Sequence, residues 1–379
     1  MQYLVPKLIF GCGTRSRLAA EVSCFGSSAV LFHSASLEKS GILGELCSQL
    51  TAAGISVSPF CISCAEEPTD SLADKCSGFV RDANADIVIS VGGGAVMDLG
   101  KMAAALAVNE GCAADYAEGV GGQLISKTPL PFFALPTTAG TGSEMTKNGV
   151  VTVAGYGKRS IRSDMMLAKT AIIDPELTLS VPASTTAASG TDALCQLIEC
   201  HTSKNATPFT DGITLAHIKS TYDALRVAVK DGSNLAAREA LSAGAAMSGI
   251  GIANAGLGLA HGIGGVLGGI CGIRHGICCG ILLPHAVKAN AKKGVKKYAD
   301  IAAQFGCTET DPTAASEFLA EKLAELNREI GMPSDLRDFN IPQDQLRTVA
   351  ALSANSSSTK KNPVPFTEDE IYDLLKELV

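Results

Sequence analysis

The fold is decided by Ala85-Asp-Ile-Val-Ile-Ser-Val91, which leads directly into Gly92-Gly93-Gly94-Ala95-Val96-Met97-Asp98-Leu99-Gly100-Lys101. The apolar run predicts a buried strand, and the pattern continuing to Val108 predicts a helix. Glycines at such a turn let the backbone approach a phosphate, and the start of a helix offers free N–H groups and the positive end of its dipole. The stretch matches neither the P-loop nor the GxGxxG spacing. It indicates a phosphate site, or else a tight turn that binds no ligand.

Outward from this stretch, short apolar runs alternate with helical patterns. Strands are predicted at 27–33, 55–62, 85–91 and 132–135, with further β-like runs at 150–153 and 171–173. Helices are predicted at 38–53 and 68–84, besides the one that ends near Val108. Such alternation is typical of right-handed βαβ units and a parallel sheet. From about Pro182 onward the pattern is helical throughout, which predicts an α/β half at 1–178 and an all-helical half at 179–379.

Composition restricts the classes of partner. The 379 residues are 46% hydrophobic, carry a formal net charge of -7 and include no Trp, so a nucleic-acid partner is not expected. Residues 244–273 contain no Asp, Glu, Lys or Arg and are long enough to cross a bilayer. Their many glycines, together with Asn254 and His261, instead favour a buried helical layer, so we expect no membrane association.

Thirteen cysteines without a secretory signal predict reduced thiols in a cytoplasmic protein. Two groups of them could do more. Cys61-x-x-Cys64 could be a redox or zinc pair, although no second such pair accompanies it. Cys278 or Cys279 could supply a metal ligand close to His275, although adjacent residues on a helix point to different faces.

A second loop, Leu135-Pro-Thr-Thr-Ala-Gly-Thr-Gly-Ser-Glu144, follows another predicted strand. Its hydroxyls belong to Thr137, Thr138, Thr141 and Ser143, and they suit contacts to phosphate, ribose or a nicotinamide amide. A polar surface turn is the simpler reading of this loop alone. Two such loops at neighbouring strand ends together predict a dinucleotide site, because a dinucleotide needs a phosphate cradle and a second polar edge.

Metal-ligating side chains gather in the helical half. Asp192 and Gln196 are spaced to lie on one helix face, and His261 and His275 come from the glycine-rich segment. A carboxylate with two imidazoles suits a divalent metal with an open position for substrate. The alternative is that Asp192 and His261 are buried structural residues.

Six strings together resemble the iron-containing (group III) alcohol dehydrogenases. They are Gly-Gly-Gly-x-x-x-Asp-x-x-Lys at 92–101, Pro-Thr-Thr-Ala-Gly-Thr-Gly-Ser-Glu at 136–144, Asp-Pro-Glu-Leu-Thr at 174–178, Gly-Thr-Asp-Ala-Leu at 190–194, Asn-Ala-Gly-Leu-Gly-Leu-Ala-His at 254–261 and Arg-His-Gly at 274–276. The resemblance implies the dehydroquinate synthase-like fold, with a Rossmann-like domain, a helical domain, and nicotinamide and metal in the cleft between them. It also implies reversible hydride transfer between NAD(P) and a small alcohol or aldehyde.

The resemblance assigns roles to individual residues. The cofactor-binding positions are Gly92, Gly93, Gly94, Ala95, Asp98, Thr137, Thr138, Thr141, Ser143 and Lys158, with Ser34 at the adenosine ribose. The metal ligands, Fe²⁺ or Zn²⁺ being the expected ion, are Asp192, His261 and His275, which also carry the catalysis, with Gln196 at the fourth position. Relatives commonly form homodimers through an N-terminal strand, for which Tyr3 to Phe10 is the candidate.

Three departures from the family pattern matter. Gln196 stands where a histidine ligand is usual, so metal affinity should fall, and a metal-independent reductase of a keto acid or charged aldehyde, similar to maleylacetate reductases, is an alternative. Gly265 replaces a histidine that would relay protons. Ser34 replaces an aspartate, so NADP is not repelled. A lyase similar to dehydroquinate synthase and a non-enzymatic NAD(P)-binding protein are the remaining alternatives.

Overall fold

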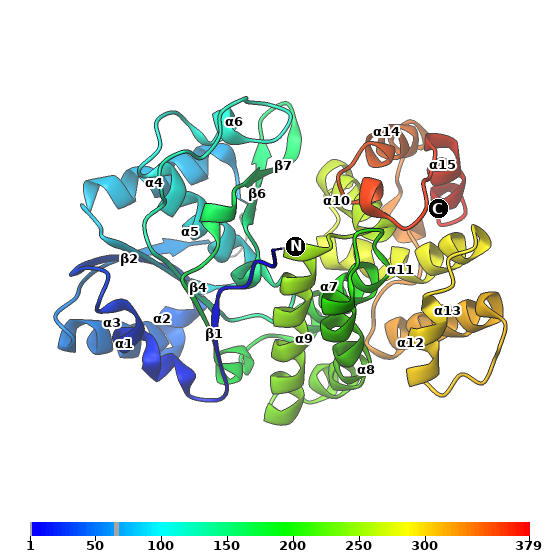
Figure 1. Cartoon of the computed structure of the whole chain (residues 1–379), viewed down its shortest axis with the longest axis horizontal. Coiled ribbons are helices and arrows are strands. Elements are labelled where there is room, and N and C mark those ends of the chain that lie inside the picture. The colour runs from blue at the N-terminus through cyan, green and yellow to red at the C-terminus, as the bar shows by residue number, and fades with distance from the viewer. Residues whose placement is uncertain (1, 64–67) are drawn as a thin grey trace. The chain divides into compact units, whose positions relative to one another are not determined.

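The computed structural model describes residues 2–63 and 68–379. The chain forms two compact units (Figure 1). The first comprises Met1–Thr138 and Gly142–Leu179, and the second comprises Ala139–Thr141 and Ser180–Val379. Each unit has its own hydrophobic core, and each is described in turn.

A six-stranded parallel sheet organises the first unit, with strand order β1-β8-β5-β4-β2-β3. Its strands are β1 Lys7–Phe10, β2 Ser28–Ser34, β3 Ser56–Ile62, β4 Ile87–Gly92, β5 Phe132–Pro136 and β8 Thr170–Ile173. Every residue of β4 is buried, as expected for a central strand covered on both faces. The predicted parallel sheet is confirmed, and the run near 171–173 belongs to it.

Helices cover both faces of this sheet (Figure 1). The helices of the unit are α1 Leu18–Val22, α2 Ser36–Ser40, α3 Ile42–Ala52, α4 Asp70–Asp82, α5 Gly94–Leu106 and α6 Ala113–Tyr116. Shorter 3₁₀ turns are η1 Thr14–Arg17, η2 Ser143–Met145, η3 Asp164–Met166 and η4 Pro175–Thr178. One apolar cluster joins the sheet to α4 and α5, and a second joins its other face to α1, α2 and α3.

One sequence prediction for this unit needs correction. The single helix expected over 38–53 is two helices, because Gly41 adopts φ 77 between them, a left-handed conformation that interrupts an α-helix. The β-like run predicted at 150–153 is confirmed as a strand, which lies outside the parallel sheet. It is part of β6 Asn148–Val153, which pairs antiparallel with β7 Gly157–Arg162.

Asp174 of the Asp-Pro-Glu-Leu-Thr string is a structural residue. Its buried carboxylate accepts hydrogen bonds from the backbone N–H groups of Gly13, Arg15 and Glu176 and from the Arg15 guanidinium, the last at 2.8 Å. It therefore caps η4 and fixes the segment that follows β1 against the end of β8.

Helices make up the regular structure of the second unit. They are α7 Ala183–Thr202, α8 Pro208–Lys230, α9 Leu235–Asn254, α10 Leu259–Cys271, α11 His275–Lys292, α12 Tyr298–Gln304, α13 Pro312–Glu329, α14 Gln343–Ala354 and α15 Glu368–Lys376, with turns η5 Arg337–Phe339 and η6 Thr359–Lys361. Helix α7 packs against α8, α9 and α11. The charge-free run is largely α9 and α10, and most of their residues are buried.

Neither α9 nor α10 alone has the length and apolar character of a membrane span. The two satisfy that test only as a pair bent by 98°, and no single helix of residues 2–63 and 68–379 satisfies it.

Helix α11 contains Pro284, which has no N–H to donate to the carbonyl of Gly280. That carbonyl accepts a 2.7 Å hydrogen bond from the Asn327 side chain of α13 instead. Gly280 and Asn327 are both buried. The carbonyl that loses its usual helical donor at the proline therefore has a hydrogen-bond partner inside the protein.

Glycine allows the helices of this unit to approach closely. A Cβ on Gly244 of α9 would lie 2.1 Å from Thr221 Oγ1 of α8, whereas a Cβ on Gly212 of α8 would meet nothing within 4 Å. The two positions therefore form a matched pair for substitution by alanine.

We expect Gly244→Ala to lower the free energy of unfolding by about 1–3 kcal/mol, because the added methyl group overpacks the α8–α9 contact. Gly212→Ala should be neutral or stabilising by up to about 1 kcal/mol, because alanine favours the helix. Urea-induced unfolding of both variants measures the difference. Equal stability of the two variants would contradict the close helix contact.

Candidate active site

The turn after β4 leaves the start of α5 open. Gly93 precedes the helix, Gly94 begins it, and no side chain caps its first N–H groups. A Cβ on Gly92 would lie 2.6 Å from Val96 Cγ2, and one on Gly100 would lie 1.9 Å from Ser90 Oγ. Glycine at these two positions thus permits the tight turn and the close approach of α5 to β4. The open helix start can bind a phosphate, as predicted.

The loop after β5 lies beside this turn. Gly92 pairs with Pro136 in the sheet, and the Thr137 N–H donates to the Gly92 carbonyl at 2.8 Å. The Cβ position of Gly93 is 3.4 Å from Thr138 Oγ1. The structure therefore brings Thr137 and Thr138 to the glycine turn.

The other predicted cofactor residues are more dispersed. Ser34 ends β2, which neighbours β4, and its buried hydroxyl is 3.0 Å from Ser36 Oγ. Thr141 is exposed, and Ala95 lies in the first turn of α5. Lys158 lies on β7 opposite Thr152. Their cofactor contacts stay predictions.

Asp98 and Ser143 belong to a buried network. The Ser143 hydroxyl donates to Asp98 Oδ1, and Asp98 Oδ2 accepts from the Val150 N–H at 3.0 Å. Asp98 therefore ties the second loop and β6 to α5. A contact of either residue with a cofactor stays a prediction.

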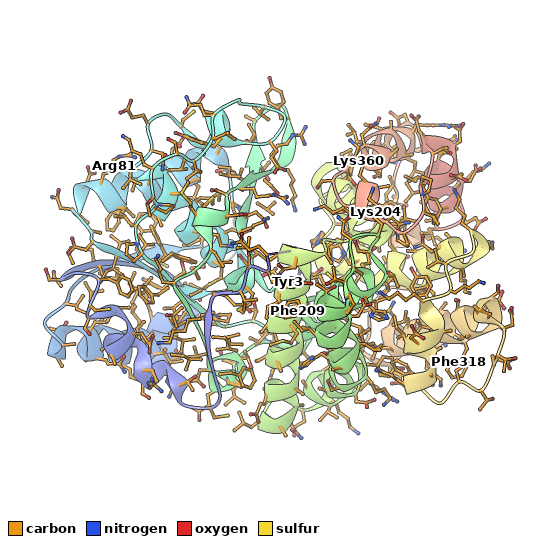
Figure 2. The ribbon with its side chains drawn as sticks, viewed as in Figure 1. Tyr3, Arg81, Lys204, Phe209, Phe318 and Lys360 are labelled. Atoms are coloured by element: carbon orange, nitrogen blue, oxygen red, sulfur yellow. The ribbon has the colours of Figure 1, made fainter. Side chains whose placement is uncertain are left out.

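Lys101 is the centre of that network. Arg81, Lys204 and Lys360 are exposed charged residues (Figure 2), whereas Lys101 is 1% exposed. Its ammonium donates to the carbonyls of Ser143 and Asn148 and to the hydroxyls of Ser143 and Thr146, at 2.7 to 3.1 Å. The three N–H bonds of this ammonium are shared among the four acceptors, and they hold the loop at 143–148 against α5. Lys101 belongs to the motif at 92–101, but the sequence pattern did not predict this role.

Burial shifts two pKa values here. Desolvation lowers the pKa of Lys101 to about 8, against the opposing charges of Asp98 and Glu144. Desolvation also raises the pKa of Glu144, which is 3% exposed, to about 7. Lys101 therefore remains mostly charged at neutral pH, while Glu144 titrates there.

We expect Lys101→Met to lower the free energy of unfolding by about 3–5 kcal/mol, because it leaves buried acceptors unpaired while filling similar volume. Lys39→Met, at an exposed position of α2, is the control and should change stability by less than about 0.5 kcal/mol. Thermal unfolding followed by circular dichroism measures both. A change at Lys101 as small as that at Lys39 would refute the anchoring role.

Glu144 should make stability depend on pH. The pKa of Glu144 is about 7 in the folded protein against 4.5 for an unperturbed glutamate. Its contribution to the free energy of unfolding is therefore fully present below pH 4.5 and is lost as pH rises through 7. Glu144→Gln should remove this loss, so the variant's free energy of unfolding should decline less over that range. Urea titrations across pH test this, with exposed Glu309→Gln as control; parallel curves for Glu144→Gln and the parent would contradict it.

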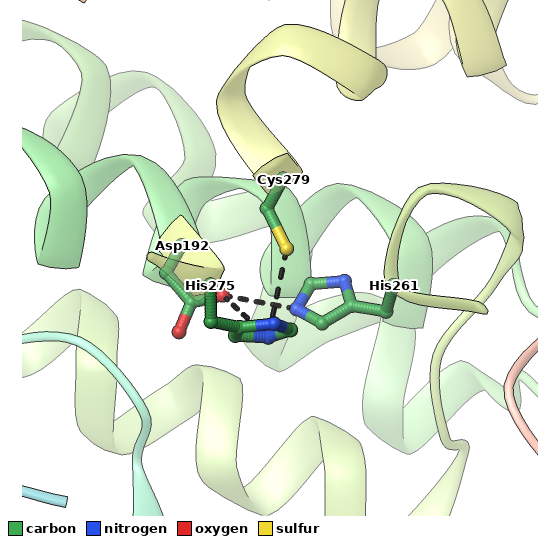
Figure 3. Close-up of side chains that lie close together, drawn as sticks. All are labelled: Asp192, His261, His275 and Cys279. Carbon is green, nitrogen blue, oxygen red and sulfur yellow. Dashed lines mark hydrogen bonds and ion pairs between the residues drawn. The ribbon is translucent and has the colours of Figure 1, made fainter. Parts of the chain in front are cut away.

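In the second unit, four potential metal ligands converge (Figure 3). They come from three helices: Asp192 from α7, His261 from α10, and His275 with Cys279 from α11. One donor atom from each lies within 4.8 Å of every other. Asp192 Oδ1 is 3.0 Å from His261 Nε2 and 3.6 Å from His275 Nε2. The structure thus brings together three predicted ligands and adds Cys279.

Glu199 orients His261. Its carboxylate accepts from His261 Nδ1 at 2.7 Å, which leaves Nε2 for the cluster. The same carboxylate accepts from the backbone N–H groups of Gly258 and Ala260 at 2.9 and 2.6 Å, at the start of α10. Asn362 Oδ1 accepts from Leu259 N–H. The free donors and positive dipole end of α10 therefore stabilise the charge that holds His261.

The site has a dry side and an open side. Asp192, His261 and Cys279 are at most 6% exposed, whereas the His275 side chain is 33% exposed. Burial alone would raise the pKa of Asp192, but the charges and hydrogen bonds of His275 and His261 outweigh it and hold that pKa below its usual range. Burial raises the pKa of the Cys279 thiol. The cluster is therefore exposed to solvent on the His275 side.

Gln196, the predicted fourth ligand, is engaged elsewhere. Its Nε2 donates to Asp192 Oδ2 at 3.0 Å, and its Oε1 accepts from the Ser248 hydroxyl at 2.6 Å. An ionised carboxylate only accepts hydrogen bonds, so the amide must turn its NH₂ group toward Asp192. The oxygen, the atom that can bind a metal, faces Ser248.

The donor set fits a divalent metal ion. Carboxylate, imidazole and thiolate are the usual ligands of Zn²⁺, and carboxylate with imidazole also suits Fe²⁺. A buried carboxylate beside two imidazoles, one of them fixed by a second carboxylate, is the arrangement that tunes such sites.

Sequence analysis missed Glu199 and did not foresee how Cys279 is placed. Glu199 follows Asp192 by two turns on α7, a spacing that could have suggested a shared helix face. Cys279 follows His275 by one turn of α11 and so shares its face, whereas Cys278 points to the Ile273 carbonyl. Of the Cys61–Cys64 pair, Cys64 lies outside the described residues. No disulfide joins any two of the described cysteines.

The chain is similar to known proteins along nearly its whole length. The model of the iron-containing alcohol dehydrogenases matches residues 6–175, and that of the C-terminal part of the Fe-containing alcohol dehydrogenase family matches residues 186–379. Long-chain-alcohol dehydrogenase 1 of Geobacillus thermodenitrificans (strain NG80-2) is 34% identical over 365 residues, covering 95% of this chain and 92% of the relative.

Solved structures give the same result. A 1,3-propanediol oxidoreductase superposes with a TM-score of 0.94 at 32% identity, covering 100% of this chain and 99% of that one. Sulfoacetaldehyde reductase from Bifidobacterium kashiwanohense in complex with NAD⁺ superposes with a TM-score of 0.90 at 29% identity, covering 100% and 98%. The chain belongs to the iron-containing alcohol dehydrogenase family. The predicted fold class is confirmed, and the protein is an oxidoreductase acting on CH–OH groups.

Proposed function

We propose that this protein is an NAD(P)-dependent, metal-dependent alcohol dehydrogenase or aldehyde reductase for small alcohols or aldehydes. The observation that carries the proposal is the convergence of Asp192, His261 and His275, at the family's ligand positions, in one buried cluster. The variant fourth position, Gln196, marks a subgroup of the family.

The first unit would bind the dinucleotide. Its phosphates would lie at the open start of α5, contacted by Gly92 to Ala95, with Thr137 and Thr138 beside them. Lys158 would add a polar contact. Ser34 carries no charge, so the end of β2 would accept NADP as well as NAD.

The second unit would bind the metal and substrate. A divalent ion, Fe²⁺ or Zn²⁺, held by Asp192, His261 and His275 would supply Lewis-acid polarisation of the substrate oxygen, while the nicotinamide would supply or accept hydride. The chain's own residues do the positioning: Glu199 fixes the His261 ring, and burial keeps Asp192 and His261 away from solvent. His275 would face the substrate, because it is the partly exposed member.

Gln196 favours one second candidate, a metal-independent reductase of a keto acid or charged aldehyde similar to maleylacetate reductases. A neutral amide at a ligand position is the observation behind it. A lyase similar to dehydroquinate synthase is less supported; it would consume no net NAD(P)H, so cofactor oxidation with an aldehyde separates it from both reductases.

Two further features belong to the proposal. A chain with thirteen cysteines, and no disulfide between any two of the described ones, supports a cytoplasmic protein. Strand β1 lies at one edge of the sheet, and Tyr3 (Figure 2), Val5 and Phe10 around it are exposed by 36%, 42% and 37%. An exposed apolar edge strand supports a homodimer formed through this segment. Neither nucleic acid nor a membrane is proposed as a partner.

We expect His261→Ala to abolish metal binding and to reduce turnover at least about 100-fold, because it removes one ligand and takes one donor, Nδ1, away from Glu199. His217→Ala on α8 should keep both properties. Metal analysis of the purified proteins and oxidation of NADH and NADPH across a panel of aldehydes measure the two effects. Full turnover after chelation and in His261→Ala would exclude the metal role and leave the metal-independent reductase.

A further inference from the structure

The metal cluster contains a sulfur atom that the family pattern does not assign. Cys279 Sγ lies 3.6 Å from His275 Nε2, and its donor lies within 4.8 Å of those of Asp192 and His261 (Figure 3). Its side chain is fully buried, so this sulfur faces the cluster and not solvent.

We propose that Cys279 is the fourth protein ligand of the metal, in place of the Gln196 amide. The inference rests on the metal-dependent function proposed above and names a ligand of that same site. As the metal–sulfur bond forms, the thiol proton leaves to solvent, and the resulting ligand set is one carboxylate, two imidazoles and one thiolate.

Distances within the cluster fit this ligand set. With bonds of about 2.0 Å to nitrogen or oxygen and about 2.3 Å to sulfur, a tetrahedral ion separates two N or O ligands by roughly 3.3 Å and an N from an S ligand by roughly 3.6 Å. The observed separations are 3.0 and 3.6 Å from Asp192 Oδ1 to the two imidazoles and 3.6 Å from His275 Nε2 to Cys279 Sγ. The other three pairs of donor atoms lie within 4.8 Å of one another, so closing the site around an ion would draw those pairs closer.

Helix geometry places the sulfur where it can replace a lost imidazole. His275 and Cys279 are one turn apart on α11, so a single helix face presents both to the ion. The side-chain amide of Gln196 on α7 donates a hydrogen bond to Asp192 and accepts one from Ser248. Turning its oxygen to the metal would break both bonds.

Cys195 is the competing sulfur. It lies 3.5 Å from His261 Nδ1, in a second group with Glu199. That nitrogen is already held by the Glu199 carboxylate at 2.7 Å, so a metal there would have to displace the bond that orients His261. The first cluster uses His261 Nε2 and leaves this bond intact.

A thiolate ligand has a consequence for the choice of metal. Soft sulfur ligands favour Zn²⁺ over Fe²⁺ relative to an all-imidazole and carboxylate set. We therefore expect the protein to retain Zn²⁺ in preference to Fe²⁺ when both are offered at equal concentration, despite its family.

Cobalt substitution tests the ligand directly. Full-length protein stripped of metal and loaded with Co²⁺ should show a thiolate-to-cobalt charge-transfer band in the near ultraviolet. Cys279→Ser should lose the band. In chelator competition it should bind Zn²⁺ more than about 100-fold less tightly, because losing a ligand costs more metal affinity than losing a residue that only supports a ligand. Cys195→Ser, Cys278→Ser and Gln196→Leu should all keep the band.

The outcomes separate the possibilities. A band kept in Cys279→Ser, a band lost in Cys195→Ser, or no band or no metal binding in the parent, overturns the proposal. Where Cys279→Ser does not fold, Cys195→Ser and Cys278→Ser decide, because a band that both of them keep excludes the two other sulfurs near the site. NAD(P)H oxidation is measured on the same samples. Activity without the band refutes only the thiolate ligand, whereas the band without activity refutes only the proposed dehydrogenase.

Discussion

The carboxylate of Glu199 meets two requirements of the helical unit at once. It accepts from the first backbone N–H groups of α10, and it accepts from the Nδ1 of His261 on the same helix. A buried carboxylate needs such compensation, since an unpaired one in this environment would be strongly unfavourable. The helix start supplies it, so the direction of the His261 ring follows from how α10 begins against α7.

The first unit solves a similar problem with the opposite charge. Lys101 is buried, and its ammonium is compensated by carbonyls and hydroxyls of one loop together with the nearby Asp98. The hydroxyl-rich loop is thereby fixed by groups that face inward, while Thr137 and Thr138 remain beside the glycine turn. In both units, a polar group buried behind the site positions the groups in front.

Sequence patterns predicted the parallel sheet because its strands are continuous apolar runs between helices, and β4 is the clearest example. They failed at Gly41, because a glycine within a helical pattern is compatible with either an unbroken helix or a left-handed break.

For the site, the resemblance supplied Asp192, His261 and His275. It could not supply Glu199 or the orientation of Gln196, since these depend on α9 and α10 meeting α7 in space. Single-helix spacing could have paired Cys279 with His275, but only the fold shows which cysteine faces the cluster.

The proline in α11 has a consequence for the way this protein can be rebuilt. Pro284 frees the carbonyl of Gly280, the residue directly after Cys279, and Asn327 of α13 occupies it. The helix that carries two of the clustered side chains is therefore completed by a helix distant in sequence. Grafting α11 into another scaffold without α13 would transfer the side chains but leave a main-chain acceptor unpaired beside them, so the transplantable unit is the helix pair.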